Sequence, residues 1–166
     1  MDAIEMLTND HTTVRSLFEA FRTADEGAAA PAPAYGSTGR EMAAERPVVA
    51  QLCDELELHT LIEEQLFYPA VKALNDDALN DQVARALDDH AVVKEEVAAL
   101  RAMSGALVDI AARIERLEKD VDQHATEEEQ QMFPRVAELM SSSRREALAR
   151  DMEERKRGTP ALEAAP

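Results

Sequence analysis

Two stretches of the chain, residues 59–71 and 124–136, repeat one pattern, H-x-x-x-E-E-Q-x-x-[YF]-P-x-V. A second pattern, D-H-x-x-V-[RK], occurs at residues 10–15 and again at 89–94. The patterns alternate, so each half of the chain carries one D-H element followed by one H-x-x-x-E element. A histidine and a glutamate four residues apart share one face of a helix. The sequence therefore predicts two similar helix pairs that face each other across one core.

Apolar residues recur at spacings of three and four along nearly the whole chain, which predicts helices rather than strands. Aromatic residues make up only 4% of the sequence and tryptophan is absent, which also favours helices over sheets. Four helices of similar length with short links predict an all-α fold, an up-down-up-down four-helix bundle with a short fifth C-terminal helix. The expected helices span residues 2–24, from between Glu41 and Pro47 to about Leu74, from a break at 75–77 to about Met103, from after Ser104-Gly105 to about Met140, and 141–157.

The length of 166 residues suits a single domain. We expect the bundle over residues 1–140, the short C-terminal helix over 141–157 and a loose tail over 158–166. The segment 25–40 is rich in Ala, Pro and Gly, and is expected to be a loop. The second half has no equivalent of it, so the loop is interpreted as a surface insertion, with a lid that carries Tyr35 as the alternative.

The chain is strongly acidic, with a formal net charge of −16. Such a chain repels phosphate backbones and anionic lipids, which argues against nucleic-acid and membrane-surface partners. No apolar run approaches the ~20 residues of a membrane span, and no signal peptide is visible at the N-terminus. The single cysteine, Cys53, is consistent with a reducing compartment, so a cytoplasmic location is expected.

Six residues are candidate metal ligands because they fall on the apolar, inward-facing stripes of the four long helices. The chain has only four histidines, one for each of these helices, and two of them are followed by a glutamate at i+4. Buried carboxylates need a positive partner, and Lys94 and Arg15 flank the stripes rather than lie on them. A pair of metal ions would satisfy all six groups, and imidazoles with carboxylates suit iron, manganese or zinc. The candidates are His11, His59, Glu63, His90, His124 and Glu128.

A histidine on an apolar stripe is also commonly a core residue without a ligand, and i+4 His-Glu pairs arise by chance in acidic helices. The joint occurrence of all six favours the metal site. The glutamates beside them are interpreted as solvated charges: Glu64, Glu127 and Glu129. The apolar neighbours are interpreted as core, with packing favoured over hydrogen bonding for the tyrosine: Phe67, Tyr68, Met132 and Phe133. Pro69 and Pro134 are expected to kink their helices, and Cys53 to lie off the metal face.

These motifs resemble the hemerythrin-like, or HHE cation-binding, family over about residues 3–140. The resemblance implies a non-haem centre of two iron ions, oxo- or hydroxo-bridged, with manganese or zinc less favoured. It implies that His11 and His59 bind one iron, that His90 and His124 bind the other, and that Glu63 and Glu128 bridge them.

The chain departs from the oxygen-carrying hemerythrins at two positions. Those carriers have a second histidine on the third helix and an aspartate on the fourth, where this chain has Lys94 and Glu129. One iron would therefore lose a nitrogen ligand, which leaves open positions for water or substrate. Glu129 could bridge in place of Glu128, although the symmetry with Glu63 favours Glu128.

The resemblance implies a protein that handles oxygen or reactive oxygen species, with catalase-like peroxide breakdown as one activity. A module that binds or senses oxygen, nitric oxide or iron without catalysis is the alternative, and a structural zinc or manganese site is a third. The expected partner is a small diatomic or peroxide ligand. The sequence does not determine the oligomeric state.

Overall fold

The computed structural model describes residues 1–29, 38–103 and 107–158, and these residues are almost entirely helical, with no strand among them. Two of the long helices contain a short π-helical turn that divides them into α-helical parts. The elements in chain order are α1 (Ala3–Ala29), α2 (Thr38–Ile62), η1 (Glu63–Phe67), α3 (Tyr68–Lys72), α4 (Asp77–Ala102), α5 (Leu107–Glu127), η2 (Glu128–Met132), α6 (Phe133–Leu139) and α7 (Ser142–Gly158).

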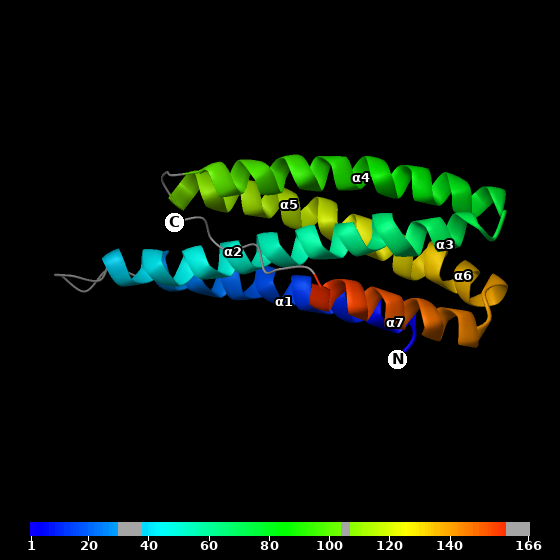
Figure 1. Cartoon of the computed structure of the whole chain (residues 1–166). Helices are drawn as coiled ribbons and strands as arrows, with labels where there is room; N and C mark the ends of the chain where they lie inside the picture. The colour runs from blue at the N-terminus through cyan, green and yellow to red at the C-terminus, as the bar shows by residue number, and fades with distance from the viewer. Residues whose placement is uncertain (30–37, 104–106, 159–166) are drawn as a thin grey trace.

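The four long helices are α1, α2 with η1 and α3, α4, and α5 with η2 and α6. Consecutive long helices run in opposite directions along one axis, and α7 folds back along the outside (Figure 1). The predicted all-α bundle with a short fifth helix is confirmed. The break at 75–77 is also confirmed, because Asp76 caps α4 by accepting a hydrogen bond from the backbone N–H of Leu79 at 3.0 Å.

The predicted loop between the first two helices is too long. Helix α1 continues to Ala29 and α2 already begins at Thr38, because glutamate and alanine residues favour helix on both sides of the Pro-containing segment. Pro47 consequently lies inside α2 and not in its first turn. The remainder of the loop with Tyr35, the break at 104–106 and the tail from 159 onward lie outside the described residues.

Two π-helical turns occupy equivalent positions in the two halves, and the sequence analysis did not anticipate them. In η1 the backbone N–H of Tyr68 bonds to the carbonyl of Glu63, and in η2 that of Phe133 bonds to the carbonyl of Glu128. A proline is the second residue after each turn, Pro69 after η1 and Pro134 after η2. Proline lacks an N–H donor and clashes with the carbonyl four residues before it, so a widened turn accommodates it.

The core consists of two apolar layers stacked along the bundle axis, with a polar layer between them. One layer surrounds Phe18, Leu52 and Leu117, and the other surrounds Tyr68, Phe67 and Val136. Each histidine lies where its helix passes from one layer to the other, as His11 does between Leu7 and Val14. The bundle therefore encloses its polar residues at mid-height, away from both ends.

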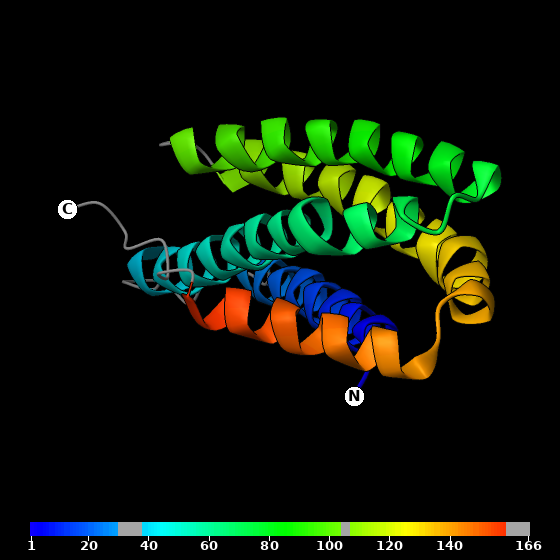
Figure 2. The same ribbon diagram turned by 45° about the vertical axis from the view of Figure 1, so that its right-hand side comes forward.

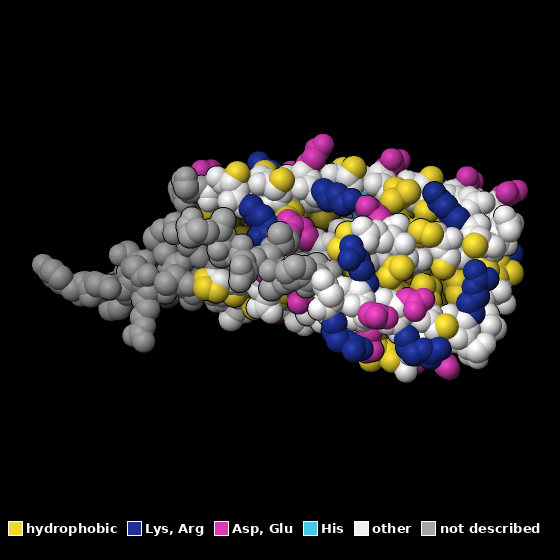
Figure 3. Space-filling model, viewed as in Figure 1, with side chains coloured by type: hydrophobic (Ala, Val, Ile, Leu, Met, Phe, Trp, Pro, Cys, Tyr) yellow, Lys and Arg dark blue, Asp and Glu magenta, His cyan; other side chains and the backbone are white. Residues whose placement is uncertain are grey.

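Helix α7 covers one side of the bundle, alongside α1 and α2 (Figure 2). Its residues Leu148, Ala149 and Met152 are buried in the same apolar layer as Met6 and Ile62. Over the described part of this face, basic side chains lie among acidic ones rather than in a separate patch (Figure 3). Within the described residues, no helix is both long and apolar enough to cross a bilayer.

Candidate metal centre

All six candidate ligands lie together in the polar layer, and all are buried. Glu63 is 0% exposed and Glu128 2%, and none of the four histidines exceeds 6%. Their ligand atoms form two groups, in each of which the atoms lie within 4.8 Å of one another. One group contains His11, His59, Glu63 and Glu128, and the other contains Glu63, His90 and His124. This division of the histidines into pairs is the one that the sequence resemblance implies, while their role as ligands stays a prediction.

The Nε2 atoms of the four imidazoles point toward the two glutamates. The oxygen Oε2 of Glu63 lies 3.2 Å from Nε2 of His59 and 3.1 Å from Nε2 of His90. The oxygen Oε2 of Glu128 lies 3.3 Å from Nε2 of His11 and 3.7 Å from Nε2 of His124. Each glutamate is therefore near one histidine of either half, as a bridging carboxylate requires.

Several buried atoms of this cluster have no hydrogen-bond partner in the protein. They include Nε2 of His11, Nε2 of His59, Oε1 of Glu63 and Oε2 of Glu128. An unsatisfied buried polar atom costs about 1–3 kcal/mol, and more when it is charged. A set of imidazole nitrogens and carboxylate oxygens that lack partners and converge at this spacing fits divalent or trivalent metal ions.

Each imidazole directs its other nitrogen, Nδ1, to a carboxylate outside the cluster. Nδ1 of His11 lies 2.8 Å from Glu129, and Nδ1 of His90 lies 3.0 Å from Glu64. The remaining two Nδ1 atoms face the aspartates of the D-H elements. Nδ1 of His124 lies 3.4 Å from Oδ2 of Asp89, and Nδ1 of His59 lies 3.7 Å from Oδ2 of Asp10. A carboxylate only accepts, so it favours the tautomer with the proton on Nδ1 and the Nε2 lone pair free for a metal.

The interpretation of Glu64 and Glu129 as solvated charges is therefore wrong. Both are partly buried and orient a histidine of the opposite half. Glu129 stands outside the buried cluster, whereas Glu128 lies within it. The signal that could have identified these residues was present in the repeat, because an acidic residue adjoins a candidate ligand at equivalent positions in both halves.

Three of the four outer carboxylates are held by a cation. Lys94 lies 2.6 Å from Glu64, Arg15 donates to Glu129 at 2.9 Å, and Lys156 of α7 donates to Asp10 at 2.6 Å. Lys94 and Arg15 thus pair with outer carboxylates and not with the buried glutamates. Asp89 makes no ion pair with a lysine or arginine among the described residues, and its side chain is 47% exposed.

Tyr68 belongs to the site, so the prediction that it acts mainly by packing is wrong. Its hydroxyl donates to Oε1 of Glu128 at 2.9 Å and lies 3.2 Å from Glu63 and 3.3 Å from Nε2 of His90. Burial, together with the charges of the two glutamates, raises the pKa of Tyr68 well above its ordinary value. The phenol therefore keeps its proton and stabilises the carboxylate of Glu128. Its counterpart Phe133 has no hydroxyl and stacks on His11 with ring centroids 5.9 Å apart.

The buried charges of the cluster shift one another's pKa values. Burial by itself would lower the pKa of His124, but the carboxylates of Asp89, Glu63 and Glu128 raise it to about 11. Burial would likewise raise the pKa of Glu63, which the surrounding imidazoles hold well below its ordinary value. Bound metal ions would supply positive charge to the same carboxylates and compete with protons for the imidazole nitrogens.

The comparison with known families and structures agrees with this geometry. The family model of the hemerythrin HHE cation-binding domain matches residues 2–136, and matches again over residues 82–160. The second match begins in α4, as expected for a chain whose two halves resemble each other. No curated protein matches the chain significantly.

One solved structure resembles the fold closely. It is the crystal structure of a hemerythrin HHE cation-binding domain-containing protein, the Rv2633c homolog from Mycobacterium kansasii. The TM-score is 0.68 at 23% sequence identity, over 95% of this chain and 86% of that one. The family match spans most of the chain and includes all six buried candidate ligands. The chain belongs to the hemerythrin HHE cation-binding domain family.

Proposed function

We propose that the chain holds two iron ions and handles oxygen or reactive oxygen species, with catalase-like breakdown of peroxide as its reaction. The observation that carries the proposal is the buried cluster of four imidazoles around two shared carboxylates, with metal-facing atoms that lack partners in the protein. Iron fits these ligand types and, when bound, supplies electrons to an oxygen ligand or takes them from it.

The side chains would divide the work as follows. His11 and His59 would hold one ion, His90 and His124 would hold the other, and Glu63 and Glu128 would bridge them. Two histidines and shared carboxylates leave each ion with fewer protein ligands than an octahedral site has, so a small molecule has room to bind.

Tyr68 supplies a proton donor at the centre. Its hydroxyl lies within hydrogen-bond distance of both bridging candidates and keeps its proton because its pKa is raised. Peroxide chemistry needs protons at the reacting oxygens, and a buried phenol can donate a hydrogen bond there without admitting bulk water.

Reversible binding of an uncharged diatomic molecule is the second candidate function. A small internal cavity, about 10 Å³ in volume, touches all four histidines, and its remaining wall is largely apolar, with Val14, Leu56 and Val93 among its residues. A cavity of this volume is at the lower limit for one water-sized molecule, and its apolar wall favours an uncharged occupant.

The test is metal analysis together with an absorption spectrum of protein purified in air. We expect two iron ions per chain, near-ultraviolet absorption from the ferric pair, and evolution of oxygen when hydrogen peroxide is added. Zinc-loaded protein is the control and should show neither signal. Iron-loaded protein that binds oxygen or nitric oxide but evolves no oxygen from peroxide would favour the second candidate, and stoichiometric zinc without iron would contradict both.

A further inference from the structure

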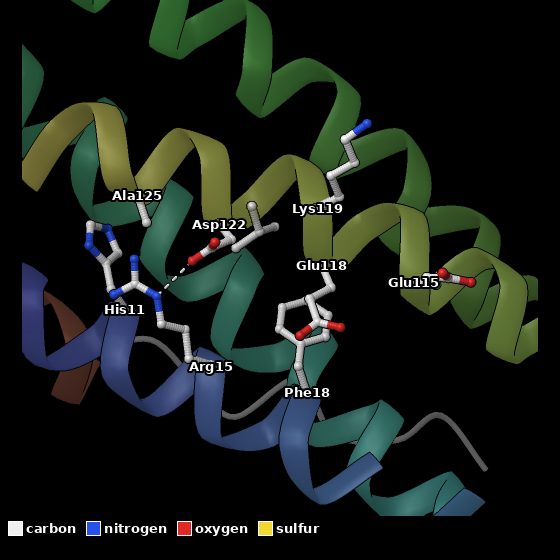
Figure 4. Close-up of a pocket in the computed structure, with 9 residues that line it drawn as sticks. His11, Arg15, Phe18, Glu115, Glu118, Lys119, Asp122 and Ala125 are labelled. Atoms are coloured by element: carbon white, nitrogen blue, oxygen red, sulfur yellow. Dashed lines mark hydrogen bonds and ion pairs between the residues drawn. The ribbon is translucent and has the colours of Figure 1, made fainter. Parts of the chain in front are cut away.

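A pocket of about 240 Å³ opens between α1 and α5 and reaches His11. Its inner wall includes Phe18, Val121 and Ala125, while Arg15, Asp122 and other charged side chains surround its outer part. Figure 4 shows His11, Arg15, Asp122 and Ala125 close together at one end, with Lys119 and Glu115 directed away from them. The pocket therefore runs from a charged rim to a predicted metal ligand.

This outer pocket and the small internal cavity over the histidines have a common wall. His11, Val121 and Ala125 line both spaces. Only the width of these side chains separates solvent from the cavity that touches all four imidazoles. Ala125 has the smallest side chain of the three, so the wall is thinnest at this residue.

The equivalent seam on the opposite side of the bundle, between α2 and α4, is bridged by Arg101, which donates to Glu57 at 2.9 Å and to Asp54 at 2.6 Å. Arg22 makes the equivalent ion pair with Glu118 across the α1–α5 seam, so these pairs do not distinguish the two seams.

The inner wall does distinguish them. The repeat aligns Thr60 with Ala125, so the same wall position carries a larger side chain on the α2–α4 seam.

The other two sides of the cluster offer less room. Helix α7 covers the side next to Glu63 with Leu148 and Met152. Beside His124, a pocket of only about 20 Å³ lies among Arg85, Asp89 and their neighbours. Of these three spaces, the α1–α5 pocket has the largest volume, about 240 Å³ against about 20 Å³ beside His124 and about 10 Å³ for the internal cavity.

One arginine spans the mouth of this approach. The Nε atom of Arg15 donates to Asp122 of α5 at 2.9 Å (Figure 4). Its Nη1 atom donates to Glu129 at 2.9 Å. Both partners are partly exposed, so the pair with Asp122 is weak and can open thermally. The rim also carries Glu115, Glu118 and Lys119, and Glu118 pairs with Arg22 of α1 at 2.9 Å.

We propose that the α1–α5 pocket is the access port through which small uncharged oxidants reach the metal centre, with the Arg15–Asp122 pair as its gate. The net charge of −16 on the whole chain disfavours anions such as superoxide, whereas hydrogen peroxide, oxygen and nitric oxide carry no charge. The assignment of oxidants as the ligand rests on the proposed function, but the existence of the port does not.

Cysteine accessibility tests the port without relying on iron chemistry. Ala125→Cys and Thr60→Cys, each with Cys53→Ser, form a matched pair, because both positions line the inner cavity and are 2% and 3% exposed. Each full-length variant is treated with methyl methanethiosulfonate, a small uncharged thiol reagent, and labelling is followed by mass spectrometry. We expect residue 125 to be labelled at least tenfold faster than residue 60, and Asp122→Ala to increase the rate at residue 125 several-fold.

Equal rates at the two positions, or faster labelling of residue 60, would overturn the port. If Ala125→Cys fails to fold, Val121→Cys and its counterpart Leu56→Cys give the same comparison, since both line the inner cavity. A sulfonate-bearing thiosulfonate should label residue 125 more slowly than the uncharged reagent, and equal rates for the two reagents would overturn the charge selection.

Nitric oxide, an uncharged probe, added to the iron-loaded protein separates this inference from the proposed function. Ala125→Leu should slow nitric oxide association at least tenfold, while Arg85→Trp, beside the smaller pocket, should leave it within twofold. The reverse ranking would overturn the port. Selective labelling of residue 125 in a protein that contains no iron would support the port and contradict the proposed function.

Discussion

The two halves of the molecule supply matching predicted ligands but different surroundings. Each half contributes two histidines and one buried glutamate, and each glutamate opens a π-helical turn with a proline as the second residue after it. Beyond the ligands the halves diverge. The first half has the Tyr68 hydroxyl, a covering helix and a lysine on Asp10, while the second half has Phe133 and an exposed Asp89. In the proposed function, metal binding would use the symmetry of the repeat, whereas proton supply and access would depend on the differences between the halves.

Removing one predicted ligand from either half should change metal content and stability the most. His59→Ala and His124→Ala should each lose most of the bound metal and about 3–5 kcal/mol of the free energy of unfolding, because each leaves a buried carboxylate with a weaker partner. Metal analysis and chemical denaturation measure both quantities. Similar losses in the two variants would support the symmetry of the ligand set, and metal content near wild type in either would remove that residue from it.

Tyr68→Phe makes the first half resemble the second. Glu128 would lose the hydrogen bond to its Oε1 atom, and we expect the free energy of unfolding to fall by about 1–3 kcal/mol. Peroxide turnover should fall with it at unchanged iron content. The matched double variant, Tyr68→Phe with Phe133→Tyr, places a hydroxyl at the equivalent position of η2, and recovery of turnover there would show that either half can supply the proton donor. Wild-type turnover in Tyr68→Phe would show that the phenol is not the proton donor.

The two aspartates of the D-H elements differ in whether a cation holds them, and replacing each one tests whether that difference affects metal affinity. Asp10→Asn removes a carboxylate held by Lys156, and Asp89→Asn removes one that has no such cation among the described residues. We expect metal affinity, measured by competition with a chelator, to fall about tenfold or more for Asp10→Asn and less for Asp89→Asn. A larger loss of metal affinity for Asp89→Asn would mean that Lys156 does not help Asp10 to orient His59.

The smallest expected effect is that of Cys53→Ser. Cys53 is 1% exposed and lies in the apolar layer away from the histidines, and burial raises the pKa of its thiol to about 11. Metal content should remain at the wild-type level. The free energy of unfolding should fall only slightly, because a buried thiol is replaced by a hydroxyl of similar size. A clear loss of metal would place Cys53 closer to the site than the structure does.

The sequence predicted the bundle and the six clustered residues because both depend on periodicity. Apolar residues at helical spacing define which face is buried, and the four histidines lie on that face. The extension of α1 to Ala29 was missed because glycine and proline were weighted above the alanines around them. The site residues Tyr68, Glu64 and Glu129 were missed for a different reason. Their roles depend on contacts between helices far apart in the sequence, such as that between Glu129 and His11, which spacing along one helix does not reveal.

The π-helical turn η1 also determines the helical phase of the residues that follow it. In an α-helix successive residues advance by about 100°, so a residue five positions after Glu63 would point roughly 140° away from it. An i→i+5 turn instead brings the fifth residue back above the first. Tyr68 can therefore reach Oε2 of Glu63 at 3.2 Å, although a regular helix would have directed its hydroxyl elsewhere. Shortening this turn by one residue would leave every predicted ligand present and rotate the Tyr68 phenol out of the site.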